Sequence, residues 1–359
     1  MKLPAFLYAL RWLIADTVRL AIASGLFAVM LTVTLLTILF CASIGFRGDV
    51  PLRSGNEKLE FLPNLDRFGP MRVTSMVGMP PIASAALVYE TVMNDPQRLE
   101  NRYGVVTVRG RMTIGFGLLE VPLSRDRAHT VQTIQLVLAG AIADGAGLLL
   151  ALVWTAGFLP SFLEASAASV LLAKPMPRWG LLLGKYVGVM VFVAGQATLF
   201  VAGTWLAMGI RTGVWDAHYL LTIPLLLIHF GIFFSFSMVV AVCTRSTIAS
   251  VIGSILFWLL CWGLNFGRHA FLVTPELSQA GGLTGWIVEI SYWVTPKPAD
   301  LGLILFDVLR AEDYFGRIVD IQKLEAAGGV MPTMSVLSSL AATMGILILA
   351  AVQFRKTDY

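Results

Sequence analysis

Long stretches without charged side chains constrain this chain more than any other feature of its sequence. Six stretches are apolar enough, at about 20 residues or more, to cross a hydrocarbon layer as helices. Backbone N–H and C=O groups cannot stay unpaired in hydrocarbon, so each stretch must be helical. The predicted spans are residues 20–44, 131–158, 181–208, 219–243, 247–266 and 334–354.

The composition supports the same conclusion. Charged residues make up 13% of the chain, apolar residues make up 57%, and the mean hydropathy is +0.78. Soluble proteins carry about 25% charged residues. A soluble domain with the composition of this chain could not bury so many apolar side chains and still present a polar surface to water. The sequence therefore predicts an all-α polytopic membrane protein. The net charge is +4, and the basic residues are scattered among loops without forming a stripe. We therefore expect no nucleic-acid partner.

The basic residues of the short loops predict the orientation, because Lys and Arg concentrate on the cytoplasmic side. Nine lie on one side, and only Arg211 lies on the other. The nine are Lys2, Arg11, Arg19, Lys174, Arg178, Lys185, Arg245, Arg355 and Lys356. We therefore expect cytoplasmic N- and C-termini in a cell (inner or plasma) membrane, with a short cytoplasmic tail over 355–359.

The segments between the spans have distinct characters. Residues 1–19 show apolar side chains at helical spacing, which fits either a cytoplasmic interfacial helix or an extension of the first span. The run from Leu20 to Phe46 is too long for the apolar core of a signal peptide, so it is interpreted as a retained anchor. Two long segments, 46–130 and 267–333, are predicted to be extracytoplasmic.

The two long segments differ from each other. In 46–130, the stretches 105–108 and 112–116 are strand-like, which predicts a small β-containing domain. In 267–333, residues 286–294 are apolar but too short to span, and 299–309 form a predicted amphipathic helix after a proline-rich break. Aromatic residues near the predicted outer ends suggest an interfacial belt; they are Trp205, Trp215, Tyr219, Trp286, Tyr292 and Trp293.

The cytoplasmic linker 159–180 is the most informative segment. Ser161 and Glu164 form a capping box after Pro160, which predicts a short helix to about residue 173. Pro175 and Pro177 then stop that helix. Such a separately capped helix can transmit force to a soluble partner, whereas the alternative interpretation is a plain interfacial hairpin.

Specific residues in this linker resemble a known family. Leu172-Ala-Lys-Pro-Met-Pro-Arg178, followed by Leu182-Leu-Gly-Lys-Tyr186, is similar to the signature of type-2 ABC exporter permeases. The similarity is greatest to the permeases of copper-enzyme maturation transporters. It covers specific residues from about 158 to 188 and in the tail, at Arg355, Lys356 and Asp358, together with the six-span layout.

The resemblance implies how the chain would work. A separate cytoplasmic ABC ATPase subunit would bind ATP and Mg²⁺, this chain would hold no cofactor, and a second permease copy or a homologue would complete the membrane dimer. The residues that the resemblance assigns to coupling with the ATPase are Glu164, Leu171, Leu172, Lys174, Pro175 and Arg178. The cargo is not implied.

The start of the third predicted span is not a nucleotide site. Gly180 and Gly184 are separated by three residues, one fewer than a phosphate loop requires, and Lys185 is followed by Tyr186 in place of Ser or Thr. Gly180, Gly184 and Gly188 instead fall on one helix face. Small residues in this pattern allow close helix packing in lipid.

Asp144 and His229 are the polar residues that stand out within predicted spans. A carboxylate at such a depth costs roughly 2.5–3.5 kcal/mol, so Asp144 should face other helices or a wet cavity. Both residues are candidates for an intramembrane pathway; the alternative is a hydrogen-bonded packing role. The three cysteines lie inside apolar runs and form neither a disulfide framework nor a metal site. No enzyme motif is present.

Two hypotheses follow. In the first, this chain is the permease subunit of an ATP-binding cassette exporter, driven by hydrolysis on its partner. In the second, it is an ATP-independent protein, either an ion-coupled carrier that uses Asp144 or a scaffold for an extracytoplasmic complex. A membrane enzyme is not expected.

Overall fold

The computed structural model describes residues 3–50, 52, 109–123, 126–158, 160, 177–274, 282–311 and 319–356. The chain divides into two compact units. The first comprises Met1–Ile38, Ile134–Trp205 and Asp216–Tyr359, and the second comprises Leu39–Thr133 and Leu206–Trp215.

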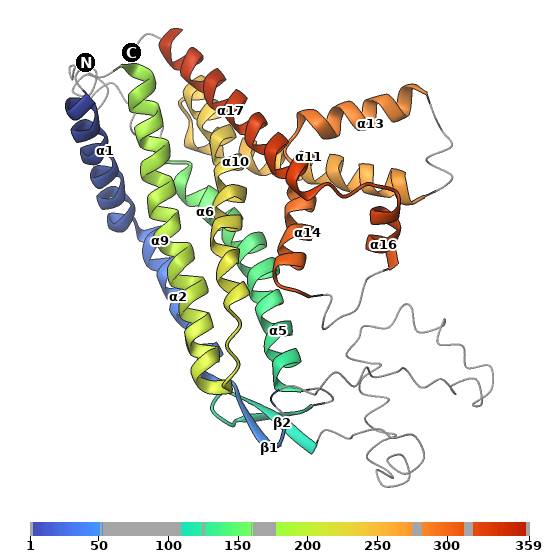
Figure 1. Cartoon of the computed structure of the whole chain (residues 1–359). Coiled ribbons are helices and arrows are strands. Elements are labelled where there is room, and N and C mark those ends of the chain that lie inside the picture. The colour runs from blue at the N-terminus through green and yellow to red at the C-terminus, as the bar shows by residue number, and fades with distance from the viewer. Residues whose placement is uncertain are drawn as a thin grey trace. The chain divides into compact units, whose positions relative to one another are not determined.

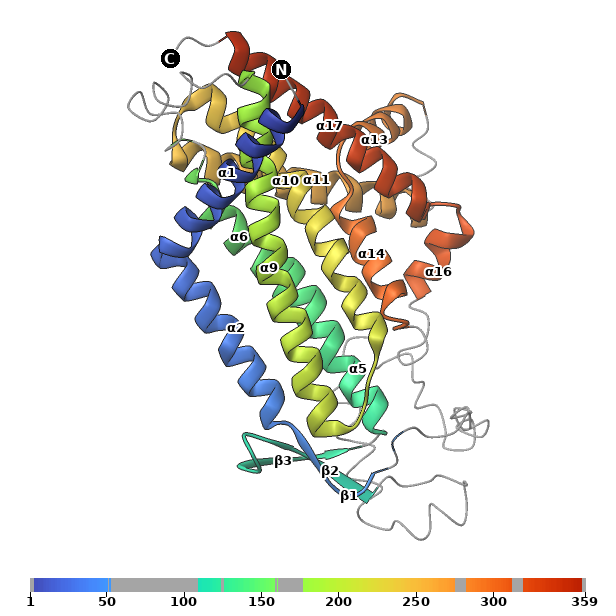
Figure 2. The same cartoon turned by 60° about the vertical axis from the view of Figure 1, so that its left-hand side comes forward.

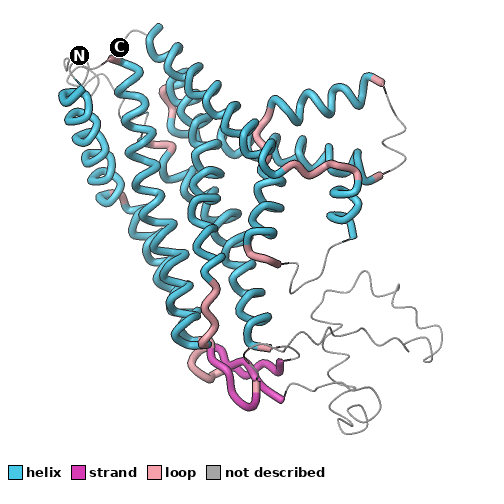
Figure 3. Tube along the Cα trace, viewed as in Figure 1, coloured by secondary structure: helices cyan, strands magenta, loops and turns pink. Residues whose placement is uncertain are grey.

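Helices dominate the described residues (Figures 1 and 3). In chain order they are α1 (Leu3–Ala23), α2 (Gly25–Ser43), α5 (Arg127–Val137), the π-helix η3 (Leu138–Gly147), α6 (Leu148–Thr155), α9 (Arg178–Thr212), the 3₁₀-helix η4 (Ala217–Leu221), α10 (Thr222–Thr244), α11 (Thr247–Val273), α13 (Leu283–Val294), α14 (Pro298–Val308), α16 (Val319–Ala326) and α17 (Pro332–Lys356).

Six helical stretches are long and apolar enough to cross a membrane, which confirms the predicted multi-pass, all-α class. They are α2, α5 through α6, α9, η4 with α10, α11, and α17. The orientation of the termini stays a prediction. In the first unit, α1 and α9 begin at the end where α17 finishes, as two views show (Figures 1 and 2), and Arg178 Nη1 donates to the carbonyl oxygen of Arg355 at 3.5 Å.

The helix α10 is the central element of the first unit. Its most apolar window is 67% buried, against 17% for α2 and for α11. It packs against α17, α11, α6 and α14. Apolar side chains on the poorly buried α2 and α11 are therefore left for lipid or for another chain.

The chain bends once between α1 and α2, at Ser24. The Ser24 hydroxyl accepts hydrogen bonds from the backbone N–H of Phe27 at 3.3 Å and from Trp154 Nε1 at 2.6 Å. It thus caps α2 while tying the bend to α6. Trp154 also packs edge-on against Phe192 of α9, at 4.5 Å between ring centroids. The sequence placed the start of the first span at residue 20, before this bend.

The turn between α10 and α11 is only two residues long. Arg245 adopts a left-handed conformation with φ of 53°, which ends α10. Ser246 then accepts a hydrogen bond from the N–H of Ala249 at 3.3 Å and caps α11. From this cap α11 runs to Val273, seven residues beyond the predicted end of the fifth span at 266.

The described part of the second unit contains an antiparallel sheet, β1 (Gly45–Asp49), β2 (Arg109–Ile114) and β3 (Leu119–Leu123), in the order β1-β2-β3. Glu120 links the strands by accepting from Arg47 at 2.6 Å and Arg111 at 3.0 Å. The hydrogen bonds from Arg111 and Arg47 hold the pKa of Glu120 below its usual value. The predicted strand 105–108 lies outside the described residues.

Candidate functional site

The first candidate site is a pair of polar side chains inside two spans. Asp144 on η3 and His229 on α10 are 85 positions apart in sequence, and their Oδ1 and Nδ1 atoms are 2.5 Å apart. The His229 side chain is 3% exposed and that of Asp144 is 19% exposed. The structure thus joins two residues that the sequence singled out separately, although their role in a pathway stays a prediction.

Asp144 lies on a π-helix whose residues are mostly small. Residues 138–147 read Leu-Ala-Gly-Ala-Ile-Ala-Asp-Gly-Ala-Gly, and the small side chains reduce the steric cost of a wider turn. The N–H of Leu148 reaches back to the carbonyl oxygen of Ala143, five residues earlier. A π-helical segment is rare and is frequent at functional sites. Its wider turn also changes which face of the segment Asp144 occupies.

Either member of the pair can donate the hydrogen bond. An imidazole Nδ1–H can donate to an ionised carboxylate, or a protonated carboxyl can donate to Nδ1. His229 Nε2 is buried and has no hydrogen-bond partner among the described residues. The ring lies against Phe233, 5.4 Å away between centroids. In such apolar surroundings, separating the two side chains would leave each polar group buried without its hydrogen-bond partner, which costs free energy.

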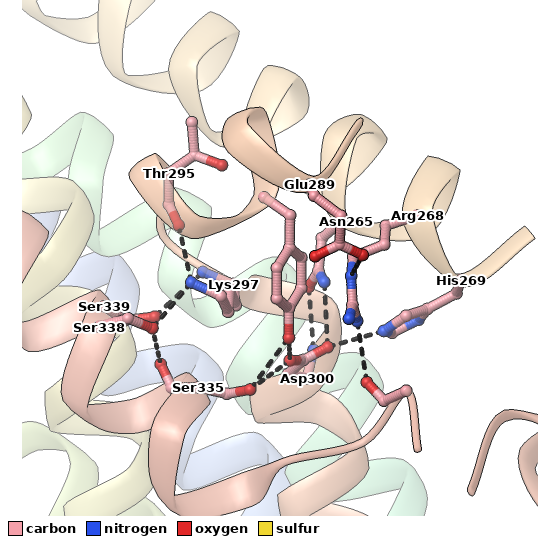
Figure 4. A network of polar contacts seen from close by, with 12 residues as sticks. Asn265, Arg268, His269, Glu289, Thr295, Lys297, Asp300, Ser335, Ser338 and Ser339 are labelled. Carbon is pink, nitrogen blue, oxygen red and sulfur yellow. Dashed lines mark hydrogen bonds and ion pairs between the residues drawn. The ribbon is translucent and has the colours of Figure 1, made fainter. Parts of the chain in front are cut away.

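A second, larger polar cluster joins α11, α13, α14 and α17 (Figure 4). We call it the Asp300 network. The Asp300 carboxylate accepts hydrogen bonds from Asn265 Nδ2 at 2.9 Å, His269 Nε2 at 2.8 Å and Tyr292 OH at 2.6 Å, and also from the Ser335 hydroxyl. Four side chains from three helices therefore converge on one buried carboxylate at the start of α14.

Two cations border this carboxylate. Lys297 is fully buried; its Nζ donates to Ser338 Oγ at 2.7 Å and lies 4.5 Å from the centre of the Tyr292 ring. Arg268 donates to Glu289 at 2.8 Å and to the carbonyl oxygen of Gly329 at 2.9 Å. Arg268 is thus paired with a carboxylate, whereas the Lys297 ammonium is satisfied by neutral oxygens of Ser338 and Thr295. Both cations are hydrogen-bonded, which lowers the cost of burying them.

Burial and hydrogen bonding oppose each other at Asp300. Burial alone would raise the pKa of its carboxyl, but the hydrogen bonds from His269, Ser335, Tyr292 and Asn265 outweigh burial and hold the pKa at about 2. Burial lowers the pKa of Lys297 to about 8, against the opposing attraction of Asp300. Burial, aided by Asp300, raises the pKa of Tyr292.

The pKa of Asp300 predicts acid sensitivity. Its folded value of about 2 lies below the ordinary 3.8, so the ionised carboxylate stabilises the fold fully above about pH 4, and the stabilisation is lost as the pH falls toward 2. We expect a loss of roughly 2 kcal/mol over that window. Thermal unfolding of purified protein between pH 5 and 2 measures it, and Asp300→Asn should flatten the dependence. An equally steep dependence in both proteins would contradict this assignment.

Sequence analysis missed this network because its charges fell in a segment taken as a loop. Arg268 and His269 continue α11, and Lys297 and Asp300 flank the Pro298 that begins α14. The available signal was the set of single charges within otherwise apolar stretches. The structure also differs from the predicted aromatic belt at Tyr219 and Tyr292, which are buried and hydrogen-bonded.

Most of the predicted coupling residues lie in a part of the chain that the structure does not describe. Glu164, Leu171, Leu172, Lys174 and Pro175 lie outside the described residues. Arg178 begins α9. Arg178 is the one member of this set among the described residues.

The predicted packing glycines lie on the buried face of α9. Gly180, Gly184 and Gly188 are all buried. A Cβ added at Gly188 would come within 2.9 Å of Thr17 Oγ1 and 3.0 Å of Thr17 Cβ, on α1. Beside this contact, Lys185 Nζ lies 3.4 Å from the carboxylate of Asp16.

This contact gives a second prediction. Gly188→Ala should destabilise the protein by about 1–3 kcal/mol, because Thr17 is β-branched, buried and bonded to the carbonyl oxygen of Leu13. Gly195→Ala is the matched control on the same helix, since an added Cβ would meet nothing within 4 Å. Thermal unfolding in detergent should separate the two variants, and equal losses would refute close α1–α9 packing.

A cavity of about 150 Å³ lies between α2, η3, α6, α9 and α10. Its lining includes Ile142 and Ala143 of η3, the two residues before Asp144, and Phe230, the residue after His229. The π-helix therefore borders both the polar pair and an apolar space.

Among the described residues, no group of three or more His, Cys, Asp or Glu side chains could hold a metal ion. The fold and these sites define a helical, multi-pass membrane protein with polar clusters inside its helix bundle. No protein-family model matches the chain, and no curated protein matches it.

Proposed function

We propose that this chain is the permease subunit of an ATP-binding cassette exporter, driven by a separate cytoplasmic ATPase. The observation that carries the proposal is the linker sequence, in which a predicted capped helix over about 161–173 is followed by Lys174-Pro175 and Arg178. Those residues resemble the coupling segment of type-2 ABC exporter permeases. The six apolar helices supply the membrane part that such a subunit needs.

The geometry of the first unit supports a mechanical role for this segment. Arg178, the last residue of the resembling run, begins the 35-residue helix α9 and reaches the end of α17. The same helix contacts α1 through Gly188 and α10 through Tyr186, whose hydroxyl donates to the carbonyl oxygen of Gly231 at 3.1 Å. A push on the linker would therefore reach three other helices through α9.

The third prediction tests the proposal by co-purification. Tagged wild-type protein, extracted from its own cells in mild detergent, should retain an ATPase subunit in stoichiometric amount. Glu164→Lys should reduce the retained ATPase at least tenfold, because it reverses a charge on the coupling helix. Glu325→Lys is the control, because it makes the same charge change at an exposed position of α16 that is distant in sequence from Glu164.

The outcomes separate two assignments. Retention of the ATPase by wild type and by Glu164→Lys alike would contradict the coupling role of Glu164. Absence of any ATPase from wild-type preparations, with monodisperse protein, would contradict the proposed function itself.

A second candidate function, an ion-coupled carrier, is favoured by the Asp144–His229 pair. An ionisable pair within membrane spans is typical of proton relays. The purified chain alone, in vesicles with a pH-sensitive dye inside, should then carry protons down an imposed pH gradient. Asp144→Asn should abolish that flux, whereas wild-type vesicles as tight as empty ones would refute this candidate.

A further inference from the structure

The walls of the cavity are hydrocarbon. It is lined by apolar side chains of four spans, among them Met30 and Val33 on α2, Leu148 on α6, Val193 on α9 and Phe230 on α10. Because all of these helices belong to membrane-spanning stretches, the cavity lies within the layer that lipid chains occupy.

Two polar side chains reach the cavity, and they bond to each other. Gln196 Nε2 donates to Thr34 Oγ1 at 2.7 Å and to the carbonyl oxygen of Met30 at 3.4 Å. The amide oxygen of Gln196 accepts no hydrogen bond from a described residue. A buried water needs about two to four polar partners, so one free acceptor does not make this a water site.

The cavity exists because one wall is built from small residues. Ala143, Ala146 and Gly147 of η3 and Ala151 of α6 face Ala197 of α9 across it. Larger side chains at these positions would fill the space, as they do in an ordinary core. The π-helix thus creates the cavity as well as placing Asp144.

The cavity is continuous with the surface that the helices offer to lipid. Two lining residues, Val33 on α2 and Ala146 on η3, are also exposed. Val33 belongs to a row of exposed apolar side chains on α2 that includes Val29 and Leu36. A neighbouring lipid chain can therefore enter between α2 and η3 without crossing a polar barrier.

We propose that this cavity binds one acyl chain of a membrane lipid. The methyl end of that acyl chain enters first, between α2 and η3. A dry cavity of about 150 Å³ in another protein takes up benzene, so the available volume of about 150 Å³ suits a segment of roughly six carbons. The inference needs no ATPase and stands independently of the proposed function.

Photolabelling tests the site directly. The purified chain is reconstituted in vesicles of phosphatidylcholine that contain a fraction of the same lipid with a diazirine in mid-chain. Val193 is 8% exposed and lines the cavity, whereas Leu256 on α11 is 59% exposed. After illumination, peptide mapping should find Val193 labelled as strongly as Leu256, because the cavity delivers a chain to a buried residue.

A cavity-filling variant supplies the control. Ala143→Leu combined with Ala197→Leu should lower the labelling of Val193 at least fivefold and leave that of Leu256 unchanged. If the double variant does not give a monodisperse peak in gel filtration, Ala197→Leu alone carries the test, with an expected twofold loss. Unlabelled Val193 in wild type, as when a side chain of a second copy fills the cavity, overturns the proposal. Labelling that is the same in wild type and variant overturns it too.

Discussion

Replacing Asp300 with alanine is expected to destabilise the protein by about 3–5 kcal/mol. The substitution removes the carboxylate that accepts from Asn265, His269, Tyr292 and Ser335. It leaves the Asn265 and His269 donors without this acceptor, and the Tyr292 and Ser335 hydroxyls keep only each other, at 3.2 Å. It also leaves Lys297 without its nearest opposite charge. Unfolding of the purified protein at pH 7, followed by tryptophan fluorescence, should show the loss as a large fall in the midpoint temperature.

Graded variants separate the network from general effects of the substitution. Asp300→Asn keeps the shape and one acceptor oxygen, so its loss should be about half that of Asp300→Ala. Asp307→Asn, at an exposed position of the same helix, should change stability by less than about 0.5 kcal/mol. A loss below about 1 kcal/mol for Asp300→Ala would show that the network does not hold α14 in place.

The six spans could be predicted because a single chain segment surrounded by lipid has few alternatives to the helical conformation. In an apolar run such as 20–44, the backbone N–H and C=O groups are the polar groups that must be hydrogen-bonded inside the bilayer. A helix forms all of these hydrogen bonds within the run itself. The ends of the spans were harder. The fifth span is predicted to end at residue 266, shortly before Arg268 and His269. In the structure both side chains find carboxylate partners and the helix continues to Val273.

The Asp300 network could not be predicted from the sequence, because its partners come from distant positions. Asn265 and Ser335 each lie 35 residues from Asp300. Hydropathy marks a single charge as costly but does not say which other charge will meet it. The proline-rich break around Pro298 was visible in the sequence, but its role in bringing Asp300 to α11 appears only in three dimensions.

The π-helix was likewise beyond sequence patterns. The predicted span 131–158 was treated as one regular helix, and a regular helix would give Asp144 a different face. Small residues around Asp144 are visible in the sequence, but a run rich in Ala and Gly also fits an ordinary tightly packed membrane helix. The pairing with His229 therefore had to come from the structure.

The Asp144–His229 pair is expected to give a large coupling energy in a double-mutant cycle. Asp144→Asn and His229→Gln each leave one polar partner buried, so each should cost about 1–3 kcal/mol. The double variant should cost less than the sum, by about 1.5–3 kcal/mol, because the bond involves an ionisable carboxylate at 2.5 Å. Unfolding in one detergent at one pH measures all four proteins.

A neutral pair in the same unit provides the reference. Thr204 Oγ1 and Tyr219 OH are buried and 3.1 Å apart, and the cycle through Thr204→Val and Tyr219→Phe should give about 0.6 kcal/mol, the usual value for hydrogen bonds between membrane helices. Equal coupling in the two cycles would show that the Asp144–His229 bond is an ordinary packing contact. A coupling two or more times larger would show that the Asp144–His229 bond is stronger than an ordinary hydrogen bond between membrane helices, as the intramembrane-pathway hypothesis predicts.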